Sequence, residues 1–200
     1  IAWMPRIAEC CRDHKKKLLC TVFNPESVWQ VDRFVAMHKI ASSEITDRDL
    51  LDKINKTGKS AILSTGGASD EQIVRAKSVL CPSISSLLAC NVEYPAKRHN
   101  IRNMLRLKNM FPELKIGYSD HSLDICSMPI LCTHYQADWY EKHVKPYDHK
   151  SFEYHALNIS EFNEMVSVMS GANESYIKNP HQRIFNSQMN KWVRPRVGNI

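Results

Sequence analysis

The sequence predicts an α/β protein with a parallel sheet, most simply a (β/α)8 barrel from which about two strands are missing. Strand-length apolar segments alternate with helical patterns from about residue 3 to residue 170. Apart from the longer interval between strands 83–90 and 115–120, the predicted strands begin roughly 20 to 26 residues apart, near the length of one βα unit in such a barrel. A doubly wound open sheet is the main alternative, but the chain has no glycine-rich phosphate loop of either common type.

The first half of the chain contains three helix–strand units. An amphipathic helix over about residues 3–15 leads into the apolar strand 17–23. Pro25 suits the first turn of a helix that extends to about residue 36, because the backbone N–H that proline lacks has no partner within the helix at that position. Strand 38–42 follows this helix. Asp47 is predicted to cap a helix that ends near Gly58, and strand 60–66 comes next.

The second half repeats this alternation. Ser69 is predicted to start a helix to about Leu80, which precedes strand 83–90, and a helix over about 100–111 leads into strand 115–120. A less regular helix over 124–135 precedes strand 137–144, and Ser160 is predicted to cap a last helix to about residue 170. From Gly171 onward the sequence is polar and irregular. We therefore expect a partial barrel domain over residues 1–171 and a linker over residues 172–200.

Composition narrows the class of protein. The chain is 43% hydrophobic and 24% charged, as is usual for a soluble globular protein. No apolar run approaches the roughly 20 residues that span a bilayer, so we expect a cytoplasmic protein with no membrane partner. The seven cysteines form no CxxC pair and are expected to be reduced thiols. The formal charge of +6 is not arranged as a basic stripe interleaved with aromatic residues, so we expect no nucleic-acid partner.

Hydroxyl groups and one lysine gather at the predicted carboxyl ends of the strands, where parallel α/β folds carry their chemistry. They are Thr21, Lys39, Ser42, Ser64 and Ser119. A single hydroxyl in such a place is ordinarily a turn or cap residue, but several on consecutive strands can converge on one anion. Lys39 stands in a strand of apolar and small residues, where an ammonium group is costly to desolvate without an anionic partner. The pattern indicates an anion site.

Two histidines, His121 and His143, end consecutive predicted strands, which lie about 5 Å apart when they pair. Their spacing leaves a metal site and a buried structural role equally open. Two imidazoles with oxygen ligands would suit Mn²⁺ or Mg²⁺ better than a closed structural zinc site. Glu44 and Glu141 are candidate catalytic carboxylates, although a helix-cap partner and a support for His143 are the plainer roles.

Four segments resemble the sialic acid synthases, a family that includes N-acetylneuraminate, legionaminate and pseudaminate synthases. They are KIASSEITDRDLLDKINKTGKSAILSTGGAS (39–69), CNVEYP (90–95), IGYSDHS (116–122) and YEKH (140–143), and the resemblance runs in order from about Trp3 to Gly171. It implies a (β/α)8 barrel, of which this chain would supply strands three to eight. It also implies a transferase that condenses phosphoenolpyruvate with an open-chain 2-acetamido sugar, giving a nine-carbon 2-keto sugar acid and phosphate.

The resemblance also implies roles for individual residues. Phosphoenolpyruvate would be held by Thr21, Lys39, Ser42, Ser64 and Ser119. His121 and His143 would bind Mn²⁺ or Mg²⁺, Tyr94 would contact the sugar, and Glu44 and Glu141 would line the reacting centre.

The chain also departs from the family pattern. Val92 stands where the family usually has Asn or Ser facing the sugar, and Asp148 is a counterpart of the family's sugar-binding aspartate only with a mismatch in spacing. The family's first two strands have no counterpart here, nor does its C-terminal antifreeze-like domain, which builds a domain-swapped homodimer. We therefore expect residues 1–200 alone to be inactive. A degenerate barrel that serves as a binding or scaffold protein is the alternative function.

Overall fold

The structure, a computed structural model, describes residues 2–146 and 154–176 and contains one parallel six-stranded sheet in the order β1-β2-β3-β4-β5-β6. The strands are β1 Leu19–Thr21, β2 Met37–Ile40, β3 Ala61–Ser64, β4 Ile84–Cys90, β5 Lys115–Asp120 and β6 Tyr140–Lys142. Every neighbouring pair is parallel. The predicted strands and their order along the chain are confirmed.

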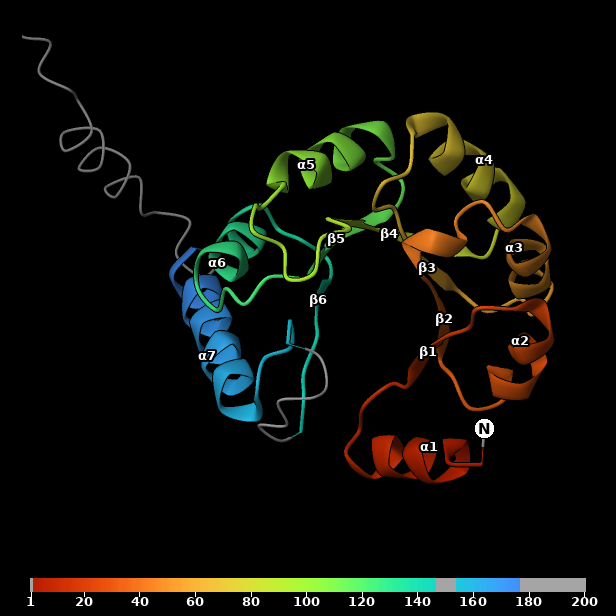
Figure 1. Cartoon of the computed structure of the whole chain (residues 1–200), viewed down its shortest axis with the longest axis horizontal. Coiled ribbons are helices and arrows are strands. Elements are labelled where there is room, and N and C mark those ends of the chain that lie inside the picture. The colour runs from red at the N-terminus through yellow and green to blue at the C-terminus, as the bar shows by residue number, and fades with distance from the viewer. Residues whose placement is uncertain (1, 147–153, 177–200) are drawn as a thin grey trace, which may run out of the picture.

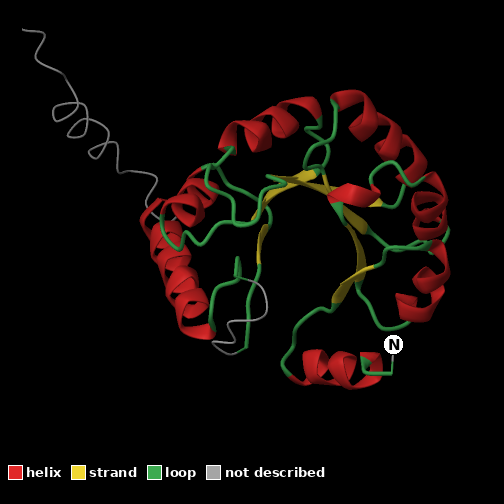
Figure 2. Cartoon of the chain, viewed as in Figure 1, coloured by secondary structure: helices red, strands yellow, loops and turns green. Residues whose placement is uncertain are grey.

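Helices cover the outer face of this sheet, which curls into an incomplete ring with β1 and β6 at its two edges (Figures 1 and 2). The helices are α1 Met4–Asp13, α2 Pro25–Asp32, α3 Arg48–Asn55, α4 Asp70–Leu80, α5 Ile101–Met110, α6 Ser127–His134 and α7 Ile159–Tyr176, with the 3-10 helix η1 Ser42–Glu44 after β2. Helix α1 lies past β1, at the open side of the ring (Figure 1). The parallel α/β class is therefore confirmed, and the curled sheet is consistent with an incomplete (β/α)8 barrel. None of the helices in the described ranges is both long and apolar enough to cross a membrane.

Capping residues explain where several helices begin. The Asp47 side chain accepts the backbone N–H of Leu50 at the start of α3. Ser69 and Gln72 bond to each other's backbone N–H groups and form a capping box at the start of α4. These two predicted helix starts are confirmed.

The predicted start of α7 at Ser160 is wrong. Asn158 accepts the N–H of Glu161 through its side chain at 2.9 Å, and the Glu161 carboxylate accepts the N–H of Asn158 at 2.8 Å. The helix therefore begins at Ile159, directly after Asn158, and it continues through Gly171 to Tyr176. Most of the predicted linker, residues 177–200, lies outside the described residues.

The hydrophobic core lies between the sheet and the helices. Outward-facing strand residues such as Ile40, Leu63, Leu87 and Tyr118 are buried in one cluster with apolar residues of α3, α4 and α5. Because side chains alternate across a strand, the residues between them face the inside of the ring. This alternation separates the core from the candidate site.

Candidate active site

One cavity of about 480 Å³ lies at the carboxyl ends of the strands and brings together most of the predicted site residues. Nine of them line it: Thr21, Lys39, Ser42, Ser64, Tyr94, Ser119, His121, Glu141 and His143. Glu44 lies on η1 and is absent from the described residues that line this cavity. Asp148 lies outside the described residues.

Lys39 is the centre of a polar chain that crosses the cavity. It is 9% exposed, and its Nζ donates a hydrogen bond to Ser64 Oγ at 2.7 Å. The same Nζ lies 3.5 Å from Glu141 Oε2, while Ser119 Oγ donates to Glu141 Oε1 at 2.6 Å. Side chains from β2, β3, β5 and β6 therefore meet around one buried cation, whose anionic partner in the structure is Glu141.

Hydrogen bonds set the tautomer of His121. Its Nδ1 lies 2.6 Å from the carbonyl oxygen of Asn91, which can only accept, so Nδ1 carries the proton. Nε2 then holds a lone pair toward the cavity, 3.2 Å from Tyr94 Oη. Because the single hydroxyl proton of Ser119 goes to Glu141, the Tyr94 hydroxyl is the donor to this nitrogen.

His121 is also kept in its neutral form. Burial lowers its pKa, the hydrogen bond to Asn91 opposes this effect, and the nearby His143 lowers the pKa further. The rings of His121 and His143 lie 5.5 Å apart between centroids. A neutral imidazole whose other nitrogen is bonded to a backbone carbonyl is the usual form of a histidine metal ligand.

This donor set fits a metal ion in part. The two imidazole rings are edge-to-face neighbours in the wall of the cavity. Within the described ranges, however, no group of three or more His, Cys, Asp or Glu side chains is arranged to hold a metal ion. His121 and His143 are thus suited to supply two nitrogens to an open site whose other ligands are oxygens of water or substrate.

Tyr94 and His155 complete an aromatic wall beside the histidine pair. The Tyr94 ring stacks on His121 with centroids 4.0 Å apart, and the His155 ring lies 4.9 Å from Tyr94 and 4.5 Å from His143. Tyr154 donates a hydrogen bond to the carbonyl oxygen of Tyr94 at 2.8 Å. The sequence interpretation missed Tyr154 and His155, because neither follows a predicted strand directly.

The sequence interpretation also missed the backbone group that holds His121. The carbonyl oxygen of Asn91 fixes the His121 ring, yet any residue type supplies a carbonyl, so the sequence holds no signal for it. The CNVEYP segment at 90–95 did mark the loop that provides this carbonyl.

Comparison with known proteins places the sequence in one family. The sequence matches the NeuB family over residues 1–179. An N,N'-diacetyllegionaminic acid synthase of Campylobacter jejuni is 40% identical over 124 residues, which cover 56% of this chain and 37% of the relative. A pseudaminic acid synthase of Helicobacter pylori is 33% identical over 151 residues, which cover 72% of this chain and 43% of the relative.

Solved structures agree with the sequence match. The crystal structure of an N-acetylneuraminic acid synthetase from Leptospira borgpetersenii, in complex with citrate, superimposes with a TM-score of 0.75 and 25% identity. The match covers 98% of this chain and 72% of that protein. The chain spans between 37% and 43% of the length of the curated relatives named above. Since the family match covers most of its residues, the chain belongs to the NeuB family of sialic acid synthases.

Proposed function

We propose that the protein condenses phosphoenolpyruvate with an N-acetylmannosamine-like 2-acetamido sugar, giving a nine-carbon 2-keto sugar acid and phosphate. The observation that carries this proposal is the buried Lys39, which meets Ser64 and Glu141 within one cavity beside two histidines. Family membership supports the same reaction class.

Phosphoenolpyruvate is the anion that this cavity would hold. Lys39 supplies the countercharge to its phosphate or carboxylate group, and the hydroxyls of Thr21, Ser42, Ser64 and Ser119 supply hydrogen-bond donors. An anion held by several donors at low exposure is fixed in orientation, with its methylene carbon free to face a second substrate.

The acceptor sugar would lie on the histidine side of the cavity. His121 and His143 would hold Mn²⁺ or Mg²⁺, which when bound supplies Lewis acidity toward the aldehyde group. Tyr94 stacks on His121 and presents its hydroxyl at the same place, so it would orient the sugar next to that group.

The reaction then needs one charge to be stabilised. The methylene carbon forms a bond to the aldehyde carbon, and positive charge develops at C2 of the former phosphoenolpyruvate. The carboxylate of Glu141 would stabilise this charge. Water adds to C2, and one of its protons is matched by a proton taken up at the aldehyde oxygen, which becomes a hydroxyl group. The C2–O bond to phosphate then breaks, and phosphate leaves with the remaining proton as C2 becomes a ketone.

Three further predictions rest on the family resemblance alone. Glu44 and Asp148 would be additional site residues, the six strands would be strands three to eight of the barrel, and the whole protein would form a domain-swapped homodimer.

A non-catalytic barrel is the second candidate function. Val92 lines the cavity with 62% of its surface exposed, at a position where the resemblance implies a polar sugar contact. An apolar side chain there weakens the recognition of a polyhydroxylated substrate. The two candidates differ in turnover, so a turnover assay separates them.

The test measures phosphate release by the protein expressed from its complete reading frame. The assay contains phosphoenolpyruvate and Mn²⁺, with N-acetylmannosamine or a 2,4-diacetamido sugar as acceptor. We expect release that requires sugar and metal and that falls at least about 100-fold in the His121→Ala variant. Absence of release with either acceptor from a folded protein, or full activity of the His121→Ala variant, would contradict the proposed synthase.

A further inference from the structure

A buried ion pair lies on the outer face of β5 and β6, behind the cavity. Asp120 and Lys142 are directly paired in the register of the two strands, and their side chains are each 1% exposed. The residues on either side of them in the chain, Ser119, Glu141 and His143 among them, line the cavity instead. Strand alternation therefore puts the ion pair and the site on opposite faces of the same two strand ends.

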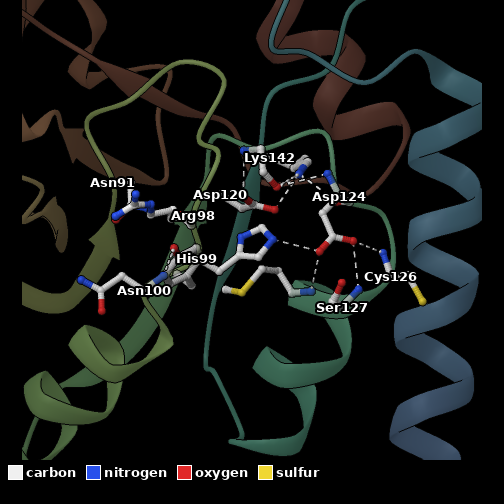
Figure 3. A network of polar contacts seen from close by, with 12 residues as sticks. Asn91, Arg98, His99, Asn100, Asp120, Asp124, Cys126, Ser127 and Lys142 are labelled. Atoms are coloured by element: carbon white, nitrogen blue, oxygen red, sulfur yellow. Dashed lines mark hydrogen bonds and ion pairs between the residues drawn. The ribbon is translucent and has the colours of Figure 1, made fainter.

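Lys142 makes contacts that reach beyond its own strand (Figure 3). Its Nζ lies 2.6 Å from Asp120 Oδ2 and 3.0 Å from the carbonyl oxygen of Asp124. Asp120 Oδ2 also accepts the Tyr140 hydroxyl at 2.5 Å, and Asp120 Oδ1 accepts the N–H of Ser122 at 2.9 Å. We call Asp120, Tyr140 and Lys142 the outer triad.

Asp124 connects the outer triad to the loop that covers the histidines (Figure 3). Its carboxylate accepts N–H groups of Cys126 and Ser127 at the start of α6 and lies 3.1 Å from His99 Nε2. His99 belongs to the same β4–α5 loop as Asn91, whose carbonyl oxygen accepts a hydrogen bond from His121 Nδ1. One set of polar contacts thus joins β5, β6, α6 and this loop.

Stability alone is a poor reason for such an arrangement. Removing two charges from water costs about as much as their attraction returns, so a buried ion pair is weak evidence for a stabilising role. The directional hydrogen bonds of the ion pair do, however, fix the position of β6 relative to β5. Because β5 is also paired with β4, a shift of the β5–β6 register by one residue would turn Glu141 and His143 away from the cavity.

We propose that Lys142 is a positioning residue, which through Asp120 and Asp124 holds the ends of β5 and β6 so that His121 meets His143 and Ser119 meets Glu141. The proposal rests on the proposed function, because it takes the two histidines as metal ligands. Lys142 itself touches no substrate. It acts through the strand ends and the loop that it ties together.

The decisive variant is the double substitution Asp120→Asn with Lys142→Met, which replaces the ion pair with neutral side chains of similar volume. It leaves no buried charge, so we expect a thermal midpoint within a few degrees of the unmodified protein. The contact with Asp124 is lost, so we expect the Mn²⁺ dissociation constant to rise at least about tenfold, as with other residues that support metal ligands. We also expect a larger fall in kcat than change in KM for phosphoenolpyruvate, because Ser119 is the single member of the proposed phosphoenolpyruvate-binding set that stands on β5 or β6.

Two further variants complete the experiment. Tyr140→Phe removes only the hydroxyl that Asp120 accepts and is expected to raise the Mn²⁺ dissociation constant several-fold; it takes the place of the double variant if that variant does not fold. Ser83→Ala is the control. It removes a buried hydroxyl that donates to the carbonyl oxygen of Asn55, before the start of β4 and away from both the outer triad and the β4–α5 loop, and it should leave Mn²⁺ affinity unchanged.

Free Mn²⁺ is measured by electron paramagnetic resonance, so the proposal has a readout that does not require turnover. Folded triad variants with Mn²⁺ affinity and kcat within twofold of the unmodified protein would overturn the positioning role. An unmodified protein that binds no Mn²⁺ would overturn it as well. An unmodified protein that binds Mn²⁺ but releases no phosphate would contradict the proposed function only, and the affinities would still decide the role of Lys142.

Discussion

Position 117 offers no room for a side chain. A Cβ atom on Gly117 would lie 2.5 Å from the carbonyl oxygen and 2.6 Å from the Cβ of Trp139, and 2.8 Å from a methyl carbon of Leu88. Trp139 in turn donates its indole N–H to Ser86 Oγ at 3.0 Å inside the ring of strands. The glycine of the IGYSDHS motif thus allows β5 and its neighbours to approach closely below the site.

We predict that Gly117→Ala destabilises the protein by about 1 to 3 kcal/mol, the usual cost of forcing extra volume into a packed site. Two of the three close atoms belong to the backbone or Cβ of Trp139, which cannot rotate away. Urea unfolding of the protein and the variant measures the difference.

Gly171 provides the matched control for this substitution. It lies in α7, and a Cβ atom added there would meet nothing within 4 Å. Gly171→Ala should therefore leave the protein as stable or stabilise it by up to about 1 kcal/mol through helix propensity. Equal effects of the two substitutions would show that crowding at position 117 is relieved by movement of its neighbours.

Among single residues, the sequence predicted which side chains line the cavity better than it predicted the contacts that hold those side chains in place. Residues such as Lys39, Ser64 and His121 were found because parallel strands bring their carboxyl ends to one edge of a sheet. The carbonyl of Asn91 has no residue signature, and His155 approaches His143 from a segment that precedes a helix. Contacts made by backbone atoms, or between residues far apart in the chain, produce no pattern in the local sequence.

Among the elements, α7 shows how one cap decides where a helix begins. Both Asn158 and Ser160 are residue types that favour the N-cap position, and only the observed pair of bonds between Asn158 and Glu161 distinguishes them. Sequence pattern alone places a helix boundary to within a few residues, and the two candidate caps lie closer together than that.

We predict that Asn158→Ala lowers the free energy of unfolding by about 1 kcal/mol, because the N–H of Glu161 loses its acceptor. Ser160→Ala removes no cap and should change stability by less than about 0.5 kcal/mol, as is usual for surface positions. Thermal or urea unfolding of the two variants side by side gives the comparison. A larger loss with Ser160→Ala would contradict the assignment of the cap.

For the whole molecule the two sheet edges are the most consequential feature. Each of β1 and β6 has a single strand neighbour within the described part of the chain, although one parallel bridge joins Val144 to Leu157 just past the end of β6. An open edge presents unpaired N–H and C=O groups, and these pair readily with another chain. The closed sheet of a barrel would leave neither edge exposed.

We therefore predict that a polypeptide limited to residues 1–200 self-associates and releases no phosphate in the assay described above. Sedimentation velocity would detect the association, and binding of a hydrophobic dye would detect exposed apolar surface. The protein from the complete reading frame, measured at the same concentration, is the control. A polypeptide of residues 1–200 that is monomeric, unfolds cooperatively and turns over substrate would refute the prediction.

The overall architecture was predictable because it depends on a repeated pattern. Six alternations of an apolar run with a helical pattern specify parallel strands whatever their side-chain details, and the structure has that order. Position 148 and the segment after Tyr176 lie outside the described residues, so the predicted aspartate contact and the linker remain predictions.

The contact between Lys39 and Glu141 bears on which compounds the cavity could bind. With 3.5 Å between the ammonium and carboxylate groups, the cavity already contains its own ion pair. A purely anionic compound, the proposed phosphoenolpyruvate included, has to compete with Glu141 for Lys39 and then leaves that carboxylate close to a like charge. A zwitterionic compound, with an acidic group for Lys39 and an ammonium group for Glu141, would satisfy both partners at once, so net charge alone is a poor guide to the compounds that this cavity selects.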